Sequence, residues 1–175
     1  MPLPIAHGLL GASLVAALHP RPERLHRLPL LAGALLANAA DLDFVLVFAL
    51  HSKGWHRGFT HSLAFGLAVC LIFVLSLGRR RAGAAVAYGL AYASHGMLDY
   101  LTTLEGGGVE LLWPFSPARL GLGWFGLSEL PSRVPPSGVL KFLAVELVLF
   151  IPLLLLVRWA RRHAGWRAGA AGRAA

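Results

Sequence analysis

The stretch Gly83–Leu104, which reads GAAVAYGLAYASHGMLDYLTTL, decides what kind of fold this chain can have. It is apolar over most of its length and long enough to cross a bilayer as a helix, for which about 20 residues are needed. Yet it carries His95 and Asp99, and an ionisable side chain at the middle of a transmembrane helix costs about 2.5–3.5 kcal/mol on insertion scales. The i, i+4 spacing places these two side chains on one face, about 6 Å apart. The stretch therefore predicts a membrane helix whose histidine and aspartate share a metal ion, the alternative being a pair that serves packing alone.

The whole chain has the composition of a membrane protein. Of its 175 residues, 57% are hydrophobic and only 14% are charged, against about 25% charged in soluble domains, and the mean hydropathy is +0.65. Five apolar segments follow one another, at 4–18, 28–50, 60–77, 83–104 and 138–158. The second, fourth and fifth are long enough to span, whereas the first and third are short. We expect an all-α, multi-pass transmembrane bundle of about four to five helices.

These segments form one expected membrane domain, residues 1–162, followed at 163–175 by a basic tail that we expect to be disordered. The Gly/Pro-rich stretch from Gly106 to Pro136 is too irregular to span, so we expect a loop that caps one end of the bundle. The single cysteine, Cys70, lies within an apolar segment, which favours a packing role.

The basic residues predict the orientation. If all five segments cross, eleven lysines and arginines lie on one side, in the 21–27 and 79–81 connections and the tail, and five lie on the other. The positive-inside rule places the eleven in the cytoplasm with the C-terminus, and it places the N-terminus outside. The net charge of +8 is therefore a topology signal. Nucleic-acid binding is not expected, and the expected partner is the lipid bilayer.

Seven side chains able to bind a metal converge on the outer face under this topology. They lie at the outer ends of the first, second and fourth segments or beside the loop between the second and third: His7, Asp41, Asp43, His56, His61, His95 and Asp99. Carboxylates and imidazoles offset the cost of their burial best by sharing a cation. We expect one extracytoplasmic metal pocket, in which His7 either completes the set or is a structural histidine.

Asp41 and Asp43 are two residues apart and would face opposite ways on a regular helix. Either the backbone is irregular there, or one aspartate binds metal directly while the other orients a ligand from behind. We favour Asp41 as the ligand and Asp43 as its support or as a general base. A loop pair at a helix end is the remaining alternative.

The segment from His56 to His61 is expected to turn back on itself. Its two histidines are five residues apart, too far around a regular helix to share a face, but Gly58 permits a turn and Thr60 can cap the helix that follows. The planar guanidinium of Arg57 can donate two parallel hydrogen bonds to a phosphate or a carboxylate. Arg57 lies on the outer side of the membrane, where the positive-inside rule does not explain an arginine, so we predict that it binds an anionic group. The alternative is an interfacial loop of amphipathic side chains.

The ligand set indicates the metal and the reaction. Imidazoles and carboxylates without a thiolate suit one or two divalent ions, zinc first and manganese or iron next, and they make a purely structural zinc less expected. The predicted ligands are His7, Asp41, His56, His61, His95 and Asp99. A metal with an open coordination position activates water, so hydrolysis is the leading reaction class.

Several short motifs within residues 1 to 125 occur in a familiar order. They are His7-Gly8, Ala40-Asp41-Leu42-Asp43, His56-Arg57-Gly58-Phe59-Thr60-His61-Ser62, Ser94-His95 to Asp99, Thr102-Thr103 and Leu111-Leu112-Trp113-Pro114-Phe115-Ser116. Together they resemble the YdjM/YbcI (DUF457) family, which implies an inner-membrane, metal-dependent hydrolase. The chain departs from the family at Ala40, where proline is usual, and this leaves the local turn open. The order His, Asp, His, His-x-x-x-Asp is also similar to the all-helical zinc-dependent phospholipases C, although a clear downstream His-x-x-x-Glu is missing.

We therefore predict a membrane-bound metal-dependent hydrolase that acts on a phosphoester or other ester of a lipid or lipid-linked substrate, or on a small-molecule ester. Two rivals use the same residues: a transporter or metal-handling protein, and a non-catalytic membrane scaffold. A transport pathway should continue polar groups into the cytoplasmic halves of the helices, which are apolar apart from Ser13 and Ser76. A scaffold would leave no open coordination position. The sequence identifies no protein partner.

Overall fold

The regular structure is helical throughout the residues that the computed structural model describes, which are 2–20, 27–103, 107–124 and 136–171. The α-helices are α1 (Pro4–Leu18), α2 (Arg27–Asn38), α3 (Phe44–Ala49), α4 (Leu63–Leu77), α5 (Ala82–Thr102) and α6 (Pro136–Ala171). Short 3₁₀ turns join them: η2 (Ala39–Asp43), η3 (Lys53–Trp55), η4 (Phe59–His61) and η5 (Arg79–Arg81). In these ranges strand pairing is limited to one isolated bridge, between Val109 and Leu120. The all-α prediction is therefore confirmed.

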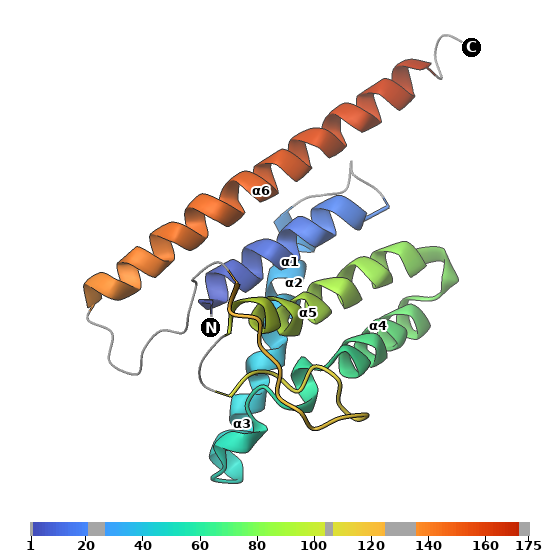
Figure 1. The fold of residues 1–175 in the computed structure, drawn as a ribbon. Coiled ribbons are helices and arrows are strands. Elements are labelled where there is room, and N and C mark those ends of the chain that lie inside the picture. The colour runs from blue at the N-terminus through green and yellow to red at the C-terminus, as the bar shows by residue number, and fades with distance from the viewer. Residues whose placement is uncertain (1, 21–26, 104–106, 125–135, 172–175) are drawn as a thin grey trace.

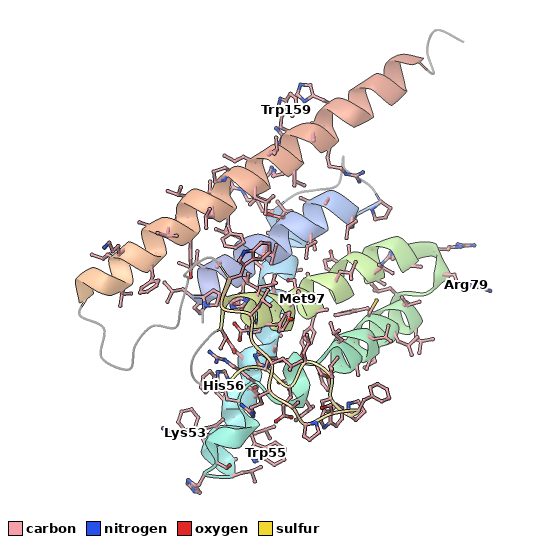
Figure 2. All side chains as sticks on the ribbon, viewed as in Figure 1. Lys53, Trp55, His56, Arg79, Met97 and Trp159 are labelled. Carbon is pink, nitrogen blue, oxygen red and sulfur yellow. The ribbon has the colours of Figure 1, made fainter. Side chains whose placement is uncertain are left out.

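The helices pack as a layered bundle. Helices α6, α1, α5 and α4 lie side by side in that order, and α2 crosses behind α1 and α5 (Figure 1). Helices α1 and α6 run in the same direction, since Glu146 contacts Leu3 before α1 and Arg161 contacts His19 after it. Arg79 and His56 lie at opposite ends of the molecule (Figure 2). The bundle therefore has a histidine-rich end and an arginine-rich end.

Two helices of the described chain are long and apolar enough to cross a membrane, Arg27–Ala49 and Gly138–His163. The bent pair Lys53–His61 and Leu63–Leu77 makes three if it is counted as one span. These are fewer than the four to five spans expected, because α1 has only 15 residues and Gly, Ser, His and Asp lower the hydropathy of α5. Large apolar side chains nevertheless face outward, Leu35, Phe48, Leu67 and Val148 among them, and such a surface suits lipid.

Two predicted segments differ from the helices observed. Segment 28–50 is built of α2, η2 and α3, and its 3₁₀ interruption coincides with the two aspartates. Helix α6 continues to Ala171, well into the tail expected to be disordered, because alanine and arginine are strong helix formers. Residues 172–175 lie outside the described residues, as do Arg21 and Arg24.

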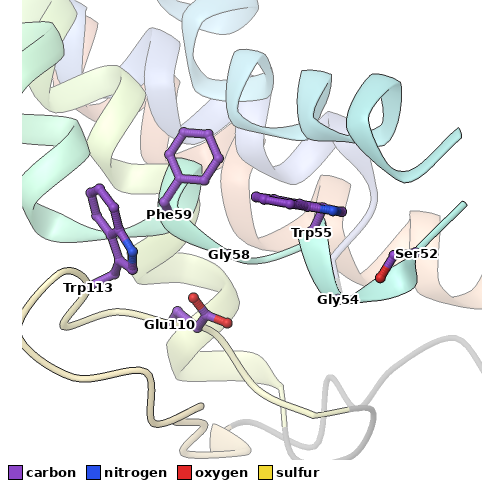
Figure 3. Close-up of a pocket in the computed structure, with 7 residues that line it drawn as sticks. All are labelled: Ser52, Gly54, Trp55, Gly58, Phe59, Glu110 and Trp113. Atoms are coloured by element: carbon purple, nitrogen blue, oxygen red, sulfur yellow. The ribbon is translucent and has the colours of Figure 1, made fainter. Parts of the chain in front are cut away.

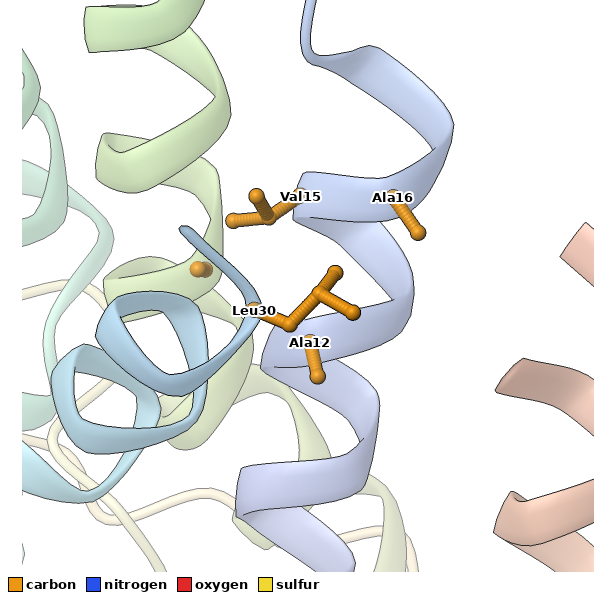
Figure 4. Packing of buried hydrophobic residues seen from close by; sticks show 5 residues of the cluster. Ala12, Val15, Ala16 and Leu30 are labelled. Carbon is orange, nitrogen blue, oxygen red and sulfur yellow. The ribbon is translucent and has the colours of Figure 1, made fainter. Parts of the chain in front are cut away.

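Small residues let α1, α2 and α5 approach closely. Ala12, Val15, Ala16 and Leu30 pack together with Ala91 of α5 (Figure 4). Where α1 crosses α2, a Cβ on Gly11 would overlap the backbone of Gly33 and the side chain of Ala37. Close packing of small residues replaces the hydrophobic effect as the force between helices in a membrane. It brings the start of α1 to the end of α2, where Asp41 and Asp43 follow.

The described part of the expected loop, residues 107–124, lies against the histidine-rich end. The Glu110 amide donates to the Arg57 carbonyl at 3.0 Å, and the Leu63 amide donates to the Leu111 carbonyl at 3.0 Å. The Leu122 amide donates to the Tyr100 carbonyl at 2.8 Å. These backbone hydrogen bonds tie residues 107–124 to the segment before α4 and to the end of α5.

Candidate metal centre

The structure brings all eight residues singled out in the sequence to the histidine-rich end. His7 is on the first turns of α1, and His95 and Asp99 are on the last turns of α5. The others come from η2 and from the segment between η3 and α4: Asp41, Asp43, His56, Arg57 and His61. The centre is thus assembled from segments almost a hundred residues apart in the chain.

One group of possible ligands is His7, His95 and Asp99, all of them buried. The His7 Nε2 atom lies 3.4 Å from Asp99 Oδ1, and the His95 Nε2 atom lies 3.9 Å from Asp99 Oδ2. The two imidazole rings are stacked, with centroids 3.8 Å apart. The i, i+4 pair therefore faces the same interior point, and α1 supplies a third donor to it.

A second group is Asp41, His56 and His61. Asp41 Oδ1 lies 3.5 Å from His61 Nε2, and the rings of His56 and His61 have their centroids 5.7 Å apart. The segment therefore folds His56 back toward His61, as its glycine allowed. The two groups adjoin, because Asp41 Oδ1 is also 3.3 Å from His95 Nε2 and Asp99 Oδ2 is 3.7 Å from His61 Nε2.

Hydrogen bonds on the outer nitrogens show which nitrogen each ring presents to the centre. His95 Nδ1 lies 2.6 Å from the Ala37 carbonyl, which can only accept, so Nδ1 carries a proton, and in the neutral ring Nε2 presents its lone pair to the centre. His61 Nδ1 lies 3.0 Å from Thr60 Oγ1, whose hydroxyl donates to Asp43 Oδ2 at 3.1 Å. The Thr60 oxygen therefore accepts from His61 Nδ1, and in the neutral ring His61 Nε2 also presents its lone pair to the centre.

In the neutral rings these lone pairs face carboxylate oxygens, and either a shared metal ion or a proton on the ring relieves that repulsion. The Nε2 atoms of His61 and His95, Asp41 Oδ1 and both Asp99 oxygens are buried without a hydrogen-bond partner among the described residues. Ligand atoms at about 2.1 Å from a tetrahedral metal stand about 3.4 Å apart, and the Asp41 contacts are 3.3 and 3.5 Å. The residues present fit a divalent metal.

Asp43 has a different environment from Asp41. It is buried and receives the Arg57 amide at 3.0 Å, the Thr60 hydroxyl at 3.1 Å and His56 Nδ1 at 3.0 Å. Because its oxygens already accept three hydrogen bonds, it is suited to hold His56 and His61 in orientation rather than to bind a metal itself. The 3₁₀ backbone of η2 is the irregularity that lets both aspartates face the centre.

Arg57 is buried, and its backbone is strained. Its φ is +59°, a left-handed conformation that costs a residue with a side chain of the order of 1–2 kcal/mol. Its amide is held by Asp43 and its carbonyl by the Glu110 amide. Its Nε lies 3.5 Å from Asp99 Oδ2. The structure therefore holds a guanidinium beside the candidate ligands at some conformational cost.

The turn into α4 differs from the prediction in one detail. Ser62, not Thr60, caps α4, because its hydroxyl accepts the Phe65 amide at 3.1 Å. Thr60 is instead used in the chain from His61 to Asp43. His61 lies just before the helix, against Gly96 of α5, where a Cβ would overlap the His61 carbonyl oxygen.

Sequence reasoning missed Glu146 and the pocket beside His56. Glu146 is buried on α6 and accepts the Leu3 amide at 2.6 Å, at the start of the helix that carries His7. The sequence feature that could have identified Glu146 is its position as a lone carboxylate inside a long apolar segment. A pocket of about 380 Å³ opens beside the centre and is lined by Phe44, Val47, Phe48, Lys53, His56, Arg57 and Arg119. No spacing rule could have predicted it, since its walls come from three separate segments.

Comparisons with known proteins find matches over more than nine-tenths of the chain. A family model described as YdjM inner membrane protein matches residues 1–168. The inner membrane protein YbcI of Escherichia coli (strain K12) is 34% identical in an alignment of 176 positions, gaps included, and this alignment covers 92% of this chain and 95% of that protein. No solved structure matches significantly. Both descriptions name the inner membrane, and neither names a reaction.

Proposed function

Because the chain belongs to the YdjM inner membrane protein family, we propose that its buried histidine and aspartate cluster acts within a membrane, as a metal-dependent hydrolase. The proposed substrate is a phosphoester or other ester of a lipid or lipid-linked molecule. The observation that carries the proposal is the pair of buried imidazole Nε2 atoms, of His61 and His95, that lie 3.5 and 3.3 Å from Asp41 Oδ1, a spacing that suits ligands of one metal ion.

The six proposed ligands would bind one or two metal ions. They are His7, Asp41, His56, His61, His95 and Asp99. A divalent transition metal, zinc before manganese or iron, would supply Lewis acidity and an activated water there. Asp43 would keep His56 and His61 in the orientation that directs their free nitrogens inward. Arg57 would bind the anionic part of the substrate.

The pocket beside the centre supports the choice of an anionic, lipid-like substrate. Its cationic lining consists of Lys53, Arg57 and Arg119, and its apolar wall is Phe44, Val47 and Phe48 of the span Arg27–Ala49. Phe48 is 74% exposed, so this wall opens toward the lipid side of the helix. An ester with a negatively charged head and an apolar chain matches both linings.

The proposed topology has α1, α2 with α3, α4, α5 and α6 crossing a bacterial inner membrane, with residues 107–124 as part of a cap over the centre. The arginine-rich end, with Arg79–Arg81 of η5 and Arg158, Arg161 and Arg162 of α6, would lie in the cytoplasm. The metal centre would then face the extracytoplasmic side, and the C-terminus would be cytoplasmic.

The proposal is tested by the metal content of the purified protein. We expect about one to two equivalents of zinc, manganese or iron by mass spectrometry, lost in a His95→Ala/Asp99→Ala variant. The matched control is His163→Ala, which removes an exposed histidine of α6 whose Nδ1 bonds the Trp159 carbonyl. Full retention of metal by the double variant would rule out the centre.

Activity is tested on the same preparations. The metal-loaded protein is expected to cleave at least one member of a panel of phosphoester and carboxylester lipids, and chelation or the double variant should abolish cleavage. Metal binding without cleavage of any ester in the panel would favour a scaffold or a metal-handling protein.

A further inference from the structure

A second pocket is built on the same segment, Ser52–Phe59, but shares no lining residue with the cationic one. It has a volume of about 340 Å³ and is lined by Ser52, Gly54, Trp55, Gly58, Phe59, Glu110 and Trp113. Figure 3 shows the side chains of Trp55, Phe59, Trp113 and Glu110 arranged around Gly58. None of these residues belongs to the candidate metal ligands.

The three rings enclose the space from different directions. Trp55 and Phe59 are 6.5 Å apart between centroids at an interplanar angle of 88°, and Phe59 and Trp113 are 5.6 Å apart at 51°. Because the rings do not stack on one another, they present faces and edges to a third group. Trp55 and Trp113 are each 39% exposed as residues, so a ligand can reach them from outside.

The carboxylate of Glu110 supplies the charge. Arg119 Nη2 binds Glu110 Oε1 at 3.2 Å, which fixes the side chain, while Arg119 itself lines the other pocket. Glu110 Oε2 would be 3.8 Å from a Cβ added to Gly58, so it lies over the glycine floor. Of the described residues that line this pocket, Glu110 alone is ionisable. The segment Ser52–Phe59 thus has the cationic pocket on one side and, on the other, a pocket in which aromatic rings surround the Glu110 carboxylate.

We propose that this aromatic pocket binds an alkylammonium group, carried either by a lipid headgroup or by a free amine such as choline. A cation is attracted to the faces of tryptophan and phenylalanine rings, and the Glu110 carboxylate complements its charge. A sugar would also stack on indole, but its hydroxyls need several partners, and apart from the two indole N–H groups the polar side chains of the lining are only Ser52 and Glu110. The proposal rests on this pocket alone and holds whether or not the metal centre is catalytic.

The test uses the full chain labelled with 5-fluorotryptophan, in nanodiscs of phosphatidylglycerol, followed by fluorine NMR. Choline chloride should shift the resonances of Trp55 and Trp113 saturably and leave that of Trp159, an exposed indole of α6 (Figure 2), in place. The neutral isostere 3,3-dimethyl-1-butanol should bind about tenfold more weakly, because it lacks the charge that the rings and Glu110 attract.

Single-residue variants test where choline binds, and nanodiscs of a second lipid test whether the natural ligand is a lipid headgroup or a free amine. Trp113→Ala and Glu110→Gln should each weaken choline binding about tenfold, whereas Trp159→Ala should not. In nanodiscs of phosphatidylcholine, shifts already present before choline is added would identify the lipid headgroup as the occupant. Shifts only after choline would identify the free amine.

The proposal is overturned by three results. One is an equal response to choline and its isostere, the second is saturation by glucose instead of choline, and the third is the absence of any shift at Trp55 and Trp113 in both membranes. These comparisons need no variant to fold, and none of them depends on bound metal or on hydrolysis.

Discussion

At the residue scale, the centre depends on which nitrogen each imidazole directs inward. The Ala37 carbonyl fixes the His95 ring, and the chain through Thr60 to Asp43 fixes the His61 ring. Partners of this kind set the tautomer and the orientation of a metal-binding histidine and raise its basicity. Asp43 is therefore important to the centre although its own oxygens are occupied.

Asp43→Asn should weaken metal binding without removing a proposed ligand. The amide cannot accept from His56, Thr60 and the Arg57 amide as a carboxylate does, so we expect a loss of about 10- to 100-fold in affinity. Competition with a fluorescent chelator measures it. Asn38→Ala, which removes a side chain bonded to the Ala34 carbonyl, is the control. An affinity within twofold of the unmodified protein would contradict the role given to Asp43.

Glu146 joins two helices through one buried carboxylate. Glu146→Leu should destabilise the protein by about 1–3 kcal/mol, because it leaves the Leu3 amide without its acceptor. Glu146→Gln keeps an acceptor and should cost less. Thermal unfolding in detergent measures both, and metal content reports whether His7 stays in place. Equal stability of the two variants would show that the hydrogen bond does not hold α1 to α6.

At the scale of elements, the centre requires α4 and α5 to approach very closely. Helix α5 has glycine at the places where neighbours touch its backbone: Gly89 beside Cys70, and Gly96 beside the His61 carbonyl. Cys70 thus packs at a helix contact, as its apolar surroundings suggested. The α5 helix is both a scaffold for His95 and Asp99 and the surface that positions His61.

Gly96→Ala and Gly83→Ala form a matched pair on α5. At Gly96 a methyl would overlap the His61 carbonyl, whereas at Gly83 it would meet Pro20 at an ordinary 3.4 Å. We expect Gly96→Ala to cost about 1–3 kcal/mol by overpacking and to lower metal content. Gly83→Ala should be neutral or stabilising by up to about 1 kcal/mol through helix propensity. Thermal unfolding and metal analysis decide, and similar behaviour of the two variants would refute the close contact.

At the scale of the whole molecule, polar groups lie inside one end and apolar groups outside. Buried histidines and aspartates are enclosed by helices whose outer faces expose leucine, valine and phenylalanine. Six arginines, Arg79–Arg81 of η5 and Arg158, Arg161 and Arg162 of α6, gather at the opposite end of α4, α5 and α6, whereas Arg57 and Arg119 lie beside the centre. The proposed orientation in the membrane is based on this difference between the histidine-rich end and the arginine-rich end.

Cysteine labelling tests the orientation directly. In a Cys70→Ser background, Ser52→Cys should react with a membrane-impermeant maleimide added to intact spheroplasts. Arg80→Cys should react only after permeabilisation, because the positive-inside rule keeps η5 in the cytoplasm. Ser52 and Arg80 are both exposed, so accessibility within the protein is matched. The reverse pattern of labelling would invert the proposed topology.

The sequence by itself determined the membrane class, the helical fold and the set of residues at the centre. Hydropathy, the spacing of His95 and Asp99 and the placement of arginines are local properties, and they carry this information directly. An irregular backbone at Asp41 and Asp43 was one of two alternatives that the sequence left open, because residues two apart cannot share a helix face, and the structure has a 3₁₀ segment there.

Only the tertiary structure decided how those residues divide and what surrounds them. Which imidazole nitrogen faces inward depends on acceptors far away in the chain, such as the Ala37 carbonyl that receives His95. Glu146 reaches Leu3 across 143 positions, and the two pockets are walled by segments that meet only when the helices pack. Such contacts follow from helix packing and not from local spacing, and for this reason hydropathy and periodicity could not predict them.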